Sequence, residues 1–488
     1  MAPIIRLNKK RGQIALMALI LLLASATHLH AVGARSLWED EGWTLLLSDG
    51  AGAAAIVQEM AYDQHPPLYF LIIGAWRDLG GESELALRFL SVAFSLLSVA
   101  ALYQLGRQLF GPGVGVLAAS LLAVWDFSID AGQDARQYSL LVLLGILACL
   151  FYFRYWAAPT RWNGLGWFIA SVAGLYTQYM LGVVLVFQLL HLLSFGGSRR
   201  LDLLIRWALI CMAFLPWSGV FLRQNQVRWE DPIYYQSGLP NSAATFRLMR
   251  DALLSQQYAL FAGLVLLGAV YWPPLWRTFR QGQGVLFLAG WALGYVALII
   301  VLNEQREILR LRIFVLVLPP LLLLMARGLA SLAPFPRLFL LGVLLVTQLG
   351  TVDTRQDNPP WRAVVQQVAQ WHQPGDPVLM DIWVGDFSAR YYVVKQMGPI
   401  TPWLSIRELR SEARAMFLPE LLGYLADHPG FWLLRWNDDP TDYEPLLAQQ
   451  GYQRSASPYI NHAGNRLYAH RYDRRPETRW PSSAHPWN

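Results

Sequence analysis

Three carboxylates stand between two tryptophans in one short stretch near the start of the chain, WEDEGWT at residues 38–44. A carboxylate can take the proton from an attacking hydroxyl group, so Asp40 or Glu41 could act as a general base. An apolar segment precedes the stretch, and a carboxylate costs roughly 2.5–3.5 kcal/mol at the centre of a membrane helix. We therefore expect the stretch at or beyond the membrane surface, where the alternative to catalysis is a solvated loop anchored by tryptophans.

Further polar residues gather at the ends of apolar segments. They are His65 and Tyr69 in HPPLYF, Arg88 in ALRF, Asp134, Arg136 and Tyr138 in DARQY, and Arg310 and Arg312 before a late apolar run. Arginine holds phosphate through paired, charge-assisted hydrogen bonds. Carboxylates and arginines on one membrane face therefore suit a transfer from a lipid-linked phosphate.

Each of these groups also has a purely structural interpretation. Asp134 and Arg136 could form an ion pair that caps a helix. The arginines before the late apolar run could extend from the end of a span to the interface, as long basic side chains often do. His65 could be a helix-start residue whose ring packs beside the two prolines.

The sequence contains no motif that demands a cofactor. A Gly-rich phosphate loop next to a strand, an HExxH pair and a Cys/His pattern with zinc spacing are all missing. The acidic stretch could hold a divalent cation through oxygen ligands, but three adjacent carboxylates cannot all point at one ion. Metal dependence therefore stays open.

Composition indicates a membrane protein. Of the 488 residues, 55% are hydrophobic and only 15% are charged, and apolar runs of spanning length recur as far as residue 354. The net charge is +6, but most arginines lie in short loops between apolar runs, which does not suggest nucleic acid as a partner. Cys149 and Cys211 both fall inside apolar segments, where they are expected as small core residues.

The placement of basic residues predicts the topology. Residues 6–11 carry four basic side chains before the first apolar run, which reads as a signal anchor with the N-terminus in the cytoplasm. We expect eleven spans, with a long outer loop at 33–82 that holds short interfacial helices at 51–62 and 66–79, and a second polar outer loop at 126–136. The expected spans are 14–32, 85–105, 114–125, 138–155, 165–176, 181–193, 207–221, 258–271, 285–302, 313–325 and 338–351.

After residue 352 the composition becomes ordinary and polar. We expect residues 1–352 to form the transmembrane domain and 353–488 a small soluble α/β domain outside the membrane. In that domain the pattern predicts helices at 361–371, 411–427 and 443–450, strands at 377–381 and 431–435, and a hairpin at 461–472.

These motifs, in this order, resemble the bacterial branch of glycosyltransferase family 39, membrane enzymes of the GT-C fold similar to the aminoarabinose lipid A transferases and the protein O-mannosyltransferases. The segments that carry the resemblance are SLWEDEGWT, HPPLYF, ALRF, GQDARQYSL, LYTQYM and RIFVLVLPPLLLLMARGL. The chain departs from the family pattern at Gln178, where His is usual, at Ile313, where Tyr is common, and at Leu316, where the family has a proline.

The resemblance implies an α-helical polytopic membrane protein of the GT-C type with about eleven spans. It implies a hexosyl- or pentosyltransferase that moves a sugar, with inversion, from a polyprenyl-phosphate donor to a lipid, glycan or protein acceptor. It places the protein among membrane lipids as a multi-pass protein of the bacterial inner membrane, with its C-terminal domain outside.

The resemblance also suggests a role for individual residues. Asp40 would be the catalytic base, and Glu41 and Asp134 would orient the acceptor and the base, or bind an ion if one is present. The donor phosphate would be held by Arg136 and Arg312, with Arg310 nearby. His65, Tyr69, Arg88 and Tyr138 would line the site.

Two other classes of function remain open at this stage. A transporter or lipid flippase would place ionisable residues near the middle of spans and often carries an internal repeat, whereas here the charges collect at span ends and no repeat is visible. A receptor-like scaffold that binds a glycan without turnover would keep the outer domain but would have no need of Asp40.

Overall fold

The computed structural model describes residues 2–49, 52–230, 279–306, 311–350, 358–381, 386–398, 403–405, 421–436, 444–462 and 465–474. The chain divides into two compact units. The first comprises Met1–Val32 with Leu47–Arg355, and the second comprises Gly33–Leu46 with Gln356–Asn488. The domain boundary expected at residue 352 falls within 351–357, outside the described residues.

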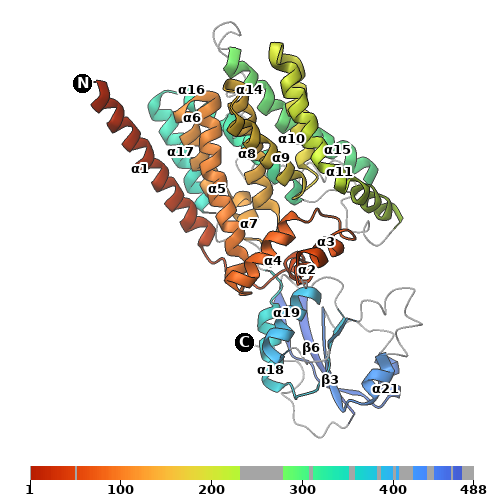
Figure 1. Ribbon diagram of the computed structural model, residues 1–488. Coiled ribbons are helices and arrows are strands. Elements are labelled where there is room, and N and C mark those ends of the chain that lie inside the picture. The colour runs from red at the N-terminus through yellow and green to blue at the C-terminus, as the bar shows by residue number, and fades with distance from the viewer. Residues whose placement is uncertain are drawn as a thin grey trace. The chain divides into compact units, whose positions relative to one another are not determined.

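Long apolar helices build the first unit (Figure 1). Within the described residues, six helical segments are long and apolar enough to cross a membrane. They include α1 (Ala2–Leu29), α5 (Glu84–Phe110), α8 (Tyr138–Ala157), α11 (Arg200–Glu230), α14 (Phe279–Ala289) continued by η3 (Gly290–Gly294) and α15 (Tyr295–Arg306), and η4 (Leu311–Val317) continued by α16 (Leu318–Ser331). The protein is therefore a multi-pass membrane protein.

Shorter helices complete this unit: α6 (Pro112–Val124), α7 (Asp126–Gly132), α9 (Arg161–Leu175), α10 (Leu181–Phe195) and α17 (Pro334–Leu349). Each predicted span except 258–271, which lies outside the described residues, coincides with helix, so the number of crossings stays a prediction. Cys149 is buried and Cys211 is partly buried, and both are free thiols.

Close backbone approach packs the helices of this unit. Gly106 of α5 faces Gly115 of α6 so closely that a Cβ on Gly106 would lie 2.9 Å from the Gly115 Cα. Small residues at such crossings are typical of membrane helices, because van der Waals contact replaces the hydrophobic drive that water provides elsewhere. Figure 1 shows α5, α6, α8 and α16 lying side by side.

Short helices gather at one end of these long helices. The interfacial helices predicted at 51–62 and 66–79 are confirmed as helices, α3 (Ala53–Met60) and α4 (Leu68–Gly80). Part of the expected polar loop at 126–136 is instead helical, since α7 continues after α6 with a bend of 64°. The bend occurs at Trp125, whose extended backbone (φ −69°, ψ 122°) interrupts the helix.

Within its described residues, the second unit contains a six-stranded mixed sheet, which confirms the predicted α/β class. Its order is β2 (Trp403–Ser405), β1 (Val378–Asp381), β3 (Gly430–Trp436), β6 (Asn465–Asp473) and β4 (Gln453–Ala456), with β5 (Tyr459–His462) also paired to β6. The first three strands are parallel, and β6 is antiparallel to its neighbours. The same unit contains three helices, α18 (Trp361–Trp371), α19 (Asp386–Met397) and α21 (Glu444–Gln449).

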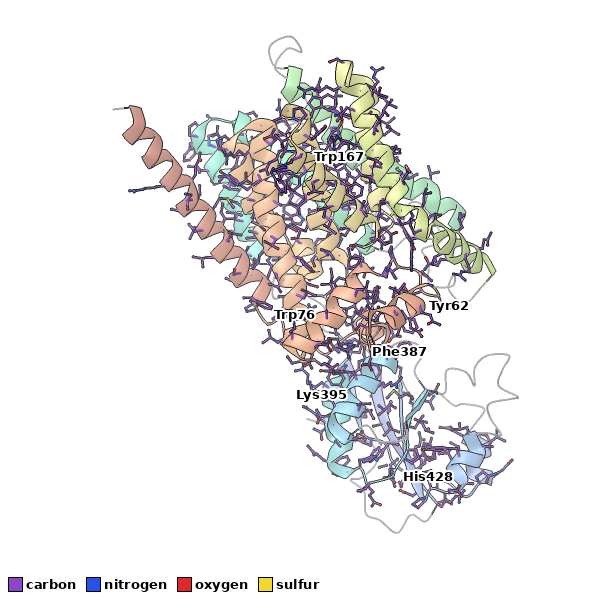
Figure 2. The ribbon with its side chains drawn as sticks, viewed as in Figure 1. Tyr62, Trp76, Trp167, Phe387, Lys395 and His428 are labelled. Atoms are coloured by element: carbon purple, nitrogen blue, oxygen red, sulfur yellow. The ribbon has the colours of Figure 1, made fainter. Side chains whose placement is uncertain are left out.

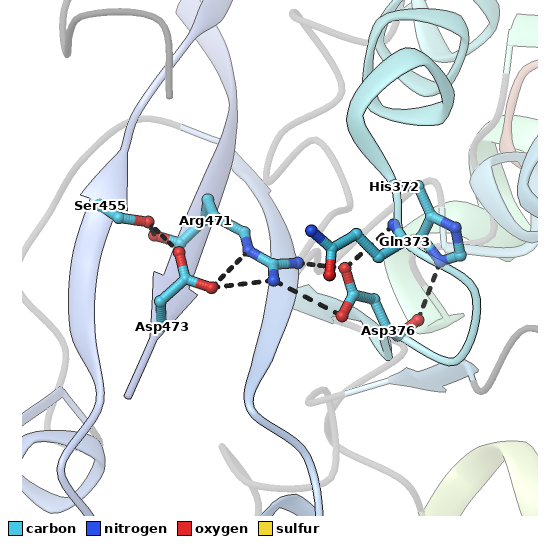
Figure 3. A network of polar contacts seen from close by, with 6 residues as sticks. All are labelled: His372, Gln373, Asp376, Ser455, Arg471 and Asp473. Carbon is cyan, nitrogen blue, oxygen red and sulfur yellow. Dashed lines mark hydrogen bonds and ion pairs between the residues drawn. The ribbon is translucent and has the colours of Figure 1, made fainter. Parts of the chain in front are cut away.

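A buried charged network ties the antiparallel part of the sheet to the turn before β1 (Figure 3). Arg471 of β6 donates to both Asp376 and Asp473, with Nη2 2.8 Å from the Asp473 Oδ1, and all three residues are buried. The backbone N–H of Gln373 donates to Asp376 as well. On the same strand, burial and then the neighbouring Glu444 carboxylate raise the pKa of Tyr472 well above its usual range. These contacts hold β6 against the turn before β1.

Candidate active site

The first unit brings one predicted carboxylate and one predicted arginine together. The Nε atom of Arg312 lies 3.6 Å from the Oδ2 atom of Asp134. The side chain of Arg312 is 36% exposed and that of Asp134 is 15% exposed, so the pair is partly open to its surroundings. Asp134 lies between α7 and α8, and Arg312 lies at the start of η4, where the chain turns toward α16. The ion pair therefore joins two connections that are distant in sequence.

Arg136, two residues after Asp134, is buried and contacts neighbouring helices. Its guanidinium lies 6.0 Å from the ring centre of Phe70, and its backbone N–H donates to the carbonyl of Asp134 at 2.7 Å. Ser91 Oγ lies 3.4 Å from the carbonyl of Arg136 and 3.3 Å from the hydroxyl of Tyr69. Tyr69 and Arg136, which the sequence predicts separately, thus meet around Ser91. Tyr138 begins α8 and is also buried.

Arg88 has a structural contact. Its Nη1 atom donates at 2.8 Å to the carbonyl of Val32, just after the end of α1, and only 1% of the residue is exposed. The side-chain amide of Gln133 donates to the carbonyls of His28 and His30 in the same region. These donors satisfy carbonyl groups that a helix end leaves without intrahelical partners.

His65 is paired with an aspartate that the sequence analysis did not single out. The Nδ1 atom of His65 lies 2.7 Å from Asp63 Oδ1, which also accepts the backbone N–H of His65 at 3.0 Å. Such a local turn is characteristic of an Asp two residues before its partner. The run DQHPP contained that signal. A carboxylate in this position orients the imidazole ring.

The acidic stretch belongs to the second unit and begins α2 (Glu39–Leu47). Asp40 lies in the first helical turn and is half-buried, whereas Glu41 is fully buried. The Oε2 atom of Glu41 accepts the backbone N–H of Trp38 at 3.2 Å, and the Trp38 carbonyl accepts the N–H groups of Glu41 and Gly42. This is the return arm of a capping box, in which the third helical residue satisfies the N-cap amide. Glu41 therefore shapes the helix start that presents Asp40.

Arg310 and a metal ion are the remaining predicted features of the site. Arg310 lies outside the described residues, and its predicted role near the donor phosphate stays a prediction. In the part of the chain that the structure describes, no three His, Cys, Asp or Glu side chains converge as a metal site would require. The binding of a divalent cation stays a prediction.

Comparison with known proteins identifies the fold. Residues 64–221 match the family model described as dolichyl-phosphate-mannose-protein mannosyltransferase. The structure of ArnT from Cupriavidus metallidurans in the apo state is similar with a TM-score of 0.64 and 15% identity, over 95% of this chain and 99% of that chain. The same protein bound to undecaprenyl phosphate gives 0.63, also at 15% identity, over 93% and 97% of the two chains.

Two more distant relatives agree with this. The Archaeoglobus fulgidus oligosaccharyltransferase, solved with a tethered acceptor peptide, is similar with a TM-score of 0.54 and 11% identity, over 94% of this chain and 74% of that chain. The oligosaccharyltransferase subunit stt-3 of Caenorhabditis elegans is 27% identical over 229 residues, which are 42% of this chain and 29% of that relative. The chain thus spans less than a third of the length of this curated relative.

These matches define the class of protein: a polytopic membrane protein with the GT-C fold of membrane glycosyltransferases. The predicted GT-C fold is thereby confirmed, and the match of residues 64–221 to the mannosyltransferase family model agrees with the resemblance that the sequence indicates.

Proposed function

We propose that the protein is an inverting glycosyltransferase that moves a sugar from a polyprenyl-phosphate donor to a hydroxyl acceptor on the outer face of the bacterial inner membrane. The observation that carries the proposal is the partly exposed pair of Asp134 and Arg312 in a chain with the fold of ArnT, which has been solved with undecaprenyl phosphate. The acceptor is a lipid, a polysaccharide or a protein, and the transferred sugar is a hexose or pentose.

The proposed reaction needs one base and a cationic phosphate site. Asp40 takes the proton of the acceptor hydroxyl while its oxygen bonds to the anomeric carbon. The bond from that carbon to the phosphate oxygen breaks on the opposite face, so the configuration inverts and the polyprenyl phosphate leaves with the electron pair. Arg312 and Arg136 stabilise the negative charge on the phosphate. Asp134 holds Arg312 in place.

Position in the structure supports different duties for the two central carboxylates. Asp40 is only half-buried and can reach a substrate, whereas Glu41 is occupied at the helix start. We assign proton transfer to Asp40 and orientation to Glu41. In the first unit, His65, Tyr69 and Tyr138 are proposed to line the donor side, and Arg88 to support it from the end of α1.

The test is a donor screen with the purified full chain in detergent. Sugars on polyprenyl phosphate are offered with glycolipid, polysaccharide and peptide acceptors, and the anomeric configuration of the product is determined. Asp40→Asn should lower kcat by about a hundredfold or more, as loss of a general base does. Glu39→Gln, which removes the adjacent carboxylate, is the matched control and should keep most of the activity. Translocation of the lipid in liposomes, without sugar transfer from any donor, would instead favour a flippase.

A further inference from the structure

We propose that Ser388, Tyr392 and Arg362 of the C-terminal domain are positioning residues that hold the acidic stretch in its working conformation. The inference rests on the proposed function, because it deepens the role of Asp40. It makes this domain a structural part of the catalytic apparatus. All of the contacts involved lie within the second unit, in which residues 33–46 pack with the C-terminal domain.

Arg362 of α18 holds the beginning of the stretch. Its Nη2 atom donates to the carbonyls of Gly33 at 3.0 Å and Arg35 at 3.1 Å. The backbone N–H of Arg362 donates to Ser36 Oγ at 3.2 Å, and the amide of Asn358 donates to the Ser36 carbonyl at 2.7 Å. The carbonyls of Gly33, Arg35 and Ser36 are thus all hydrogen-bonded by α18 or by the segment just before it.

Tyr392 and Ser388 of α19 hold the residues next to the helix start. The Tyr392 hydroxyl accepts the backbone N–H of Leu37 at 2.8 Å, and both residues are buried. Ser388 Oγ donates to the Trp38 carbonyl at 2.6 Å, and this serine is also buried. Trp38 is the N-cap of α2, so Ser388 is hydrogen-bonded to the residue from which the helix begins, two residues before Asp40.

The first turn of α2 packs directly against the same helix. A Cβ on Gly42 would lie 2.5 Å from the Ser388 amide nitrogen, so the backbones approach as closely as a glycine allows. The ring of Trp43 meets that of Phe387 edge-on, with centroids 4.6 Å apart. Phe387 and Lys395 mark the two ends of α19 in Figure 2. Hydrogen bonds, close packing and an aromatic contact therefore converge on the few residues around Asp40.

Geometry of this kind matters for a general base. A displacement of about 1 Å at the reacting centre can cost on the order of a hundredfold in rate, even when the changed residue lies far from the chemistry. Neither Ser388 nor Tyr392 carries a charge that could serve the reaction. Their effect on turnover would therefore come through the position of Asp40.

The experiment compares matched hydroxyl deletions in the full-length protein. Ser388→Ala and Tyr392→Phe remove the two hydroxyls that hold Trp38 and Leu37, singly and together. The control is Tyr452→Phe, which removes a buried hydroxyl bonded to carbonyls of the same domain away from the acidic stretch. For each protein, kcat, donor KM and hydrogen exchange of residues 33–46 are measured.

We expect the double variant to lose at least about tenfold in kcat, as misplacement of a base predicts, with donor KM within twofold. Exchange in residues 33–46 should accelerate in the double variant and stay unchanged in Tyr452→Phe. Unchanged exchange together with kcat within twofold of the original protein would overturn the inference. So would an equal fall of kcat in Tyr452→Phe, which would indicate general destabilisation.

The two proposals fail in distinguishable ways. Hydrogen exchange can be measured without turnover. If the double variant exchanges faster but the original protein uses no sugar donor, the proposed function is wrong and the structural role of Ser388 and Tyr392 still holds. Conversely, an active protein whose acidic stretch exchanges equally in all variants would keep the function and remove the positioning role.

Discussion

Arg312 and Asp134 form an ion pair, with 3.6 Å between the guanidinium Nε and the carboxylate Oδ2. The pair connects the beginning of η4 to the segment that joins α7 and α8, two parts of the chain that are distant in sequence. The arginine is exposed over about a third of its side chain and the carboxylate over less. A guanidinium carries five N–H donors in a planar fork, a geometry that suits anionic partners such as carboxylate and phosphate.

The first prediction concerns this pair. Arg312→Gln should raise the donor KM by about tenfold or more, because charge-assisted bonds to phosphate are the strong ones. Asp134→Asn should have a smaller effect of the same kind, and the double variant should lose less than the sum of the singles. A thermal unfolding curve and a full kinetic analysis of the three variants check this.

The control for this cycle is Arg206→Gln, which breaks an exposed pair of similar geometry with Asp202 on α11. It should leave donor KM unchanged. If Arg312→Gln lowers the unfolding temperature while donor KM stays the same, the pair is structural and the phosphate role is wrong.

The second prediction separates the roles of Asp40 and Glu41. Because Glu41 accepts the Trp38 amide, Glu41→Gln keeps an acceptor and should retain activity within several-fold. Glu41→Ala removes the acceptor and should cost about 1 kcal/mol of stability, as lost helix caps do. Its turnover should fall further than that of Glu41→Gln. Activity assays and unfolding of the purified chain distinguish these. A fall in Glu41→Gln as deep as that in Asp40→Asn would mean that the charge of Glu41 is itself required.

The third prediction uses the close approach at Gly42. Gly42→Ala places a methyl group against the Ser388 backbone, which cannot yield as a flexible side chain would, so turnover should fall by about tenfold or more through displacement of the helix start. Gly423→Ala is the matched control, since its Cβ would meet nothing within 4 Å. Kinetic assays of both variants provide the check, and full activity in Gly42→Ala would show that α2 can move away without consequence.

The fourth prediction concerns the stability of the C-terminal domain. Arg471→Leu leaves the buried carboxylates of Asp376 and Asp473 without their cation, and breaking a buried pair typically costs about 3–5 kcal/mol. The full-length protein should then show a lower unfolding temperature and faster proteolysis within residues 356–488. Arg466→Leu, an exposed arginine on the same strand, should change neither. Equal stability of the two variants would contradict the importance of the network.

The sequence predicted most of the membrane helices because a span requires about twenty apolar residues, a pattern that shows directly in composition. The short helices α3 and α4 were also found, since their apolar spacing and the two prolines before Leu68 are local signals. The bend at Trp125 and the helix α7 were not predicted, because a break between two apolar helices depends on tertiary packing and has no signal in the nearby sequence.

In the C-terminal domain, α18, β1, β3 and the β5–β6 hairpin were predicted, whereas α19 was missed. Its sequence, DFSARYYVVKQM, mixes aromatic, β-branched and charged residues without a clear apolar stripe. Ser388 and Tyr392 lie on this helix, and their relation to Trp38 and Leu37 is a pairing between distant segments. The local pattern predicts Asp40 as a candidate base but carries no signal for Ser388 and Tyr392, because those residues meet the acidic stretch only in the folded domain.

The hydrogen bonds to Trp38 and Leu37 come from residues 350 and 355 positions later in the chain. At usual rates of synthesis, roughly 20–70 s separate the emergence of the acidic stretch from that of α19. During that interval the first span can already be inserted while the stretch still lacks its partners. A nascent chain would then hold the donor-side residues without an ordered base, so activity would begin only after α19 has been translated.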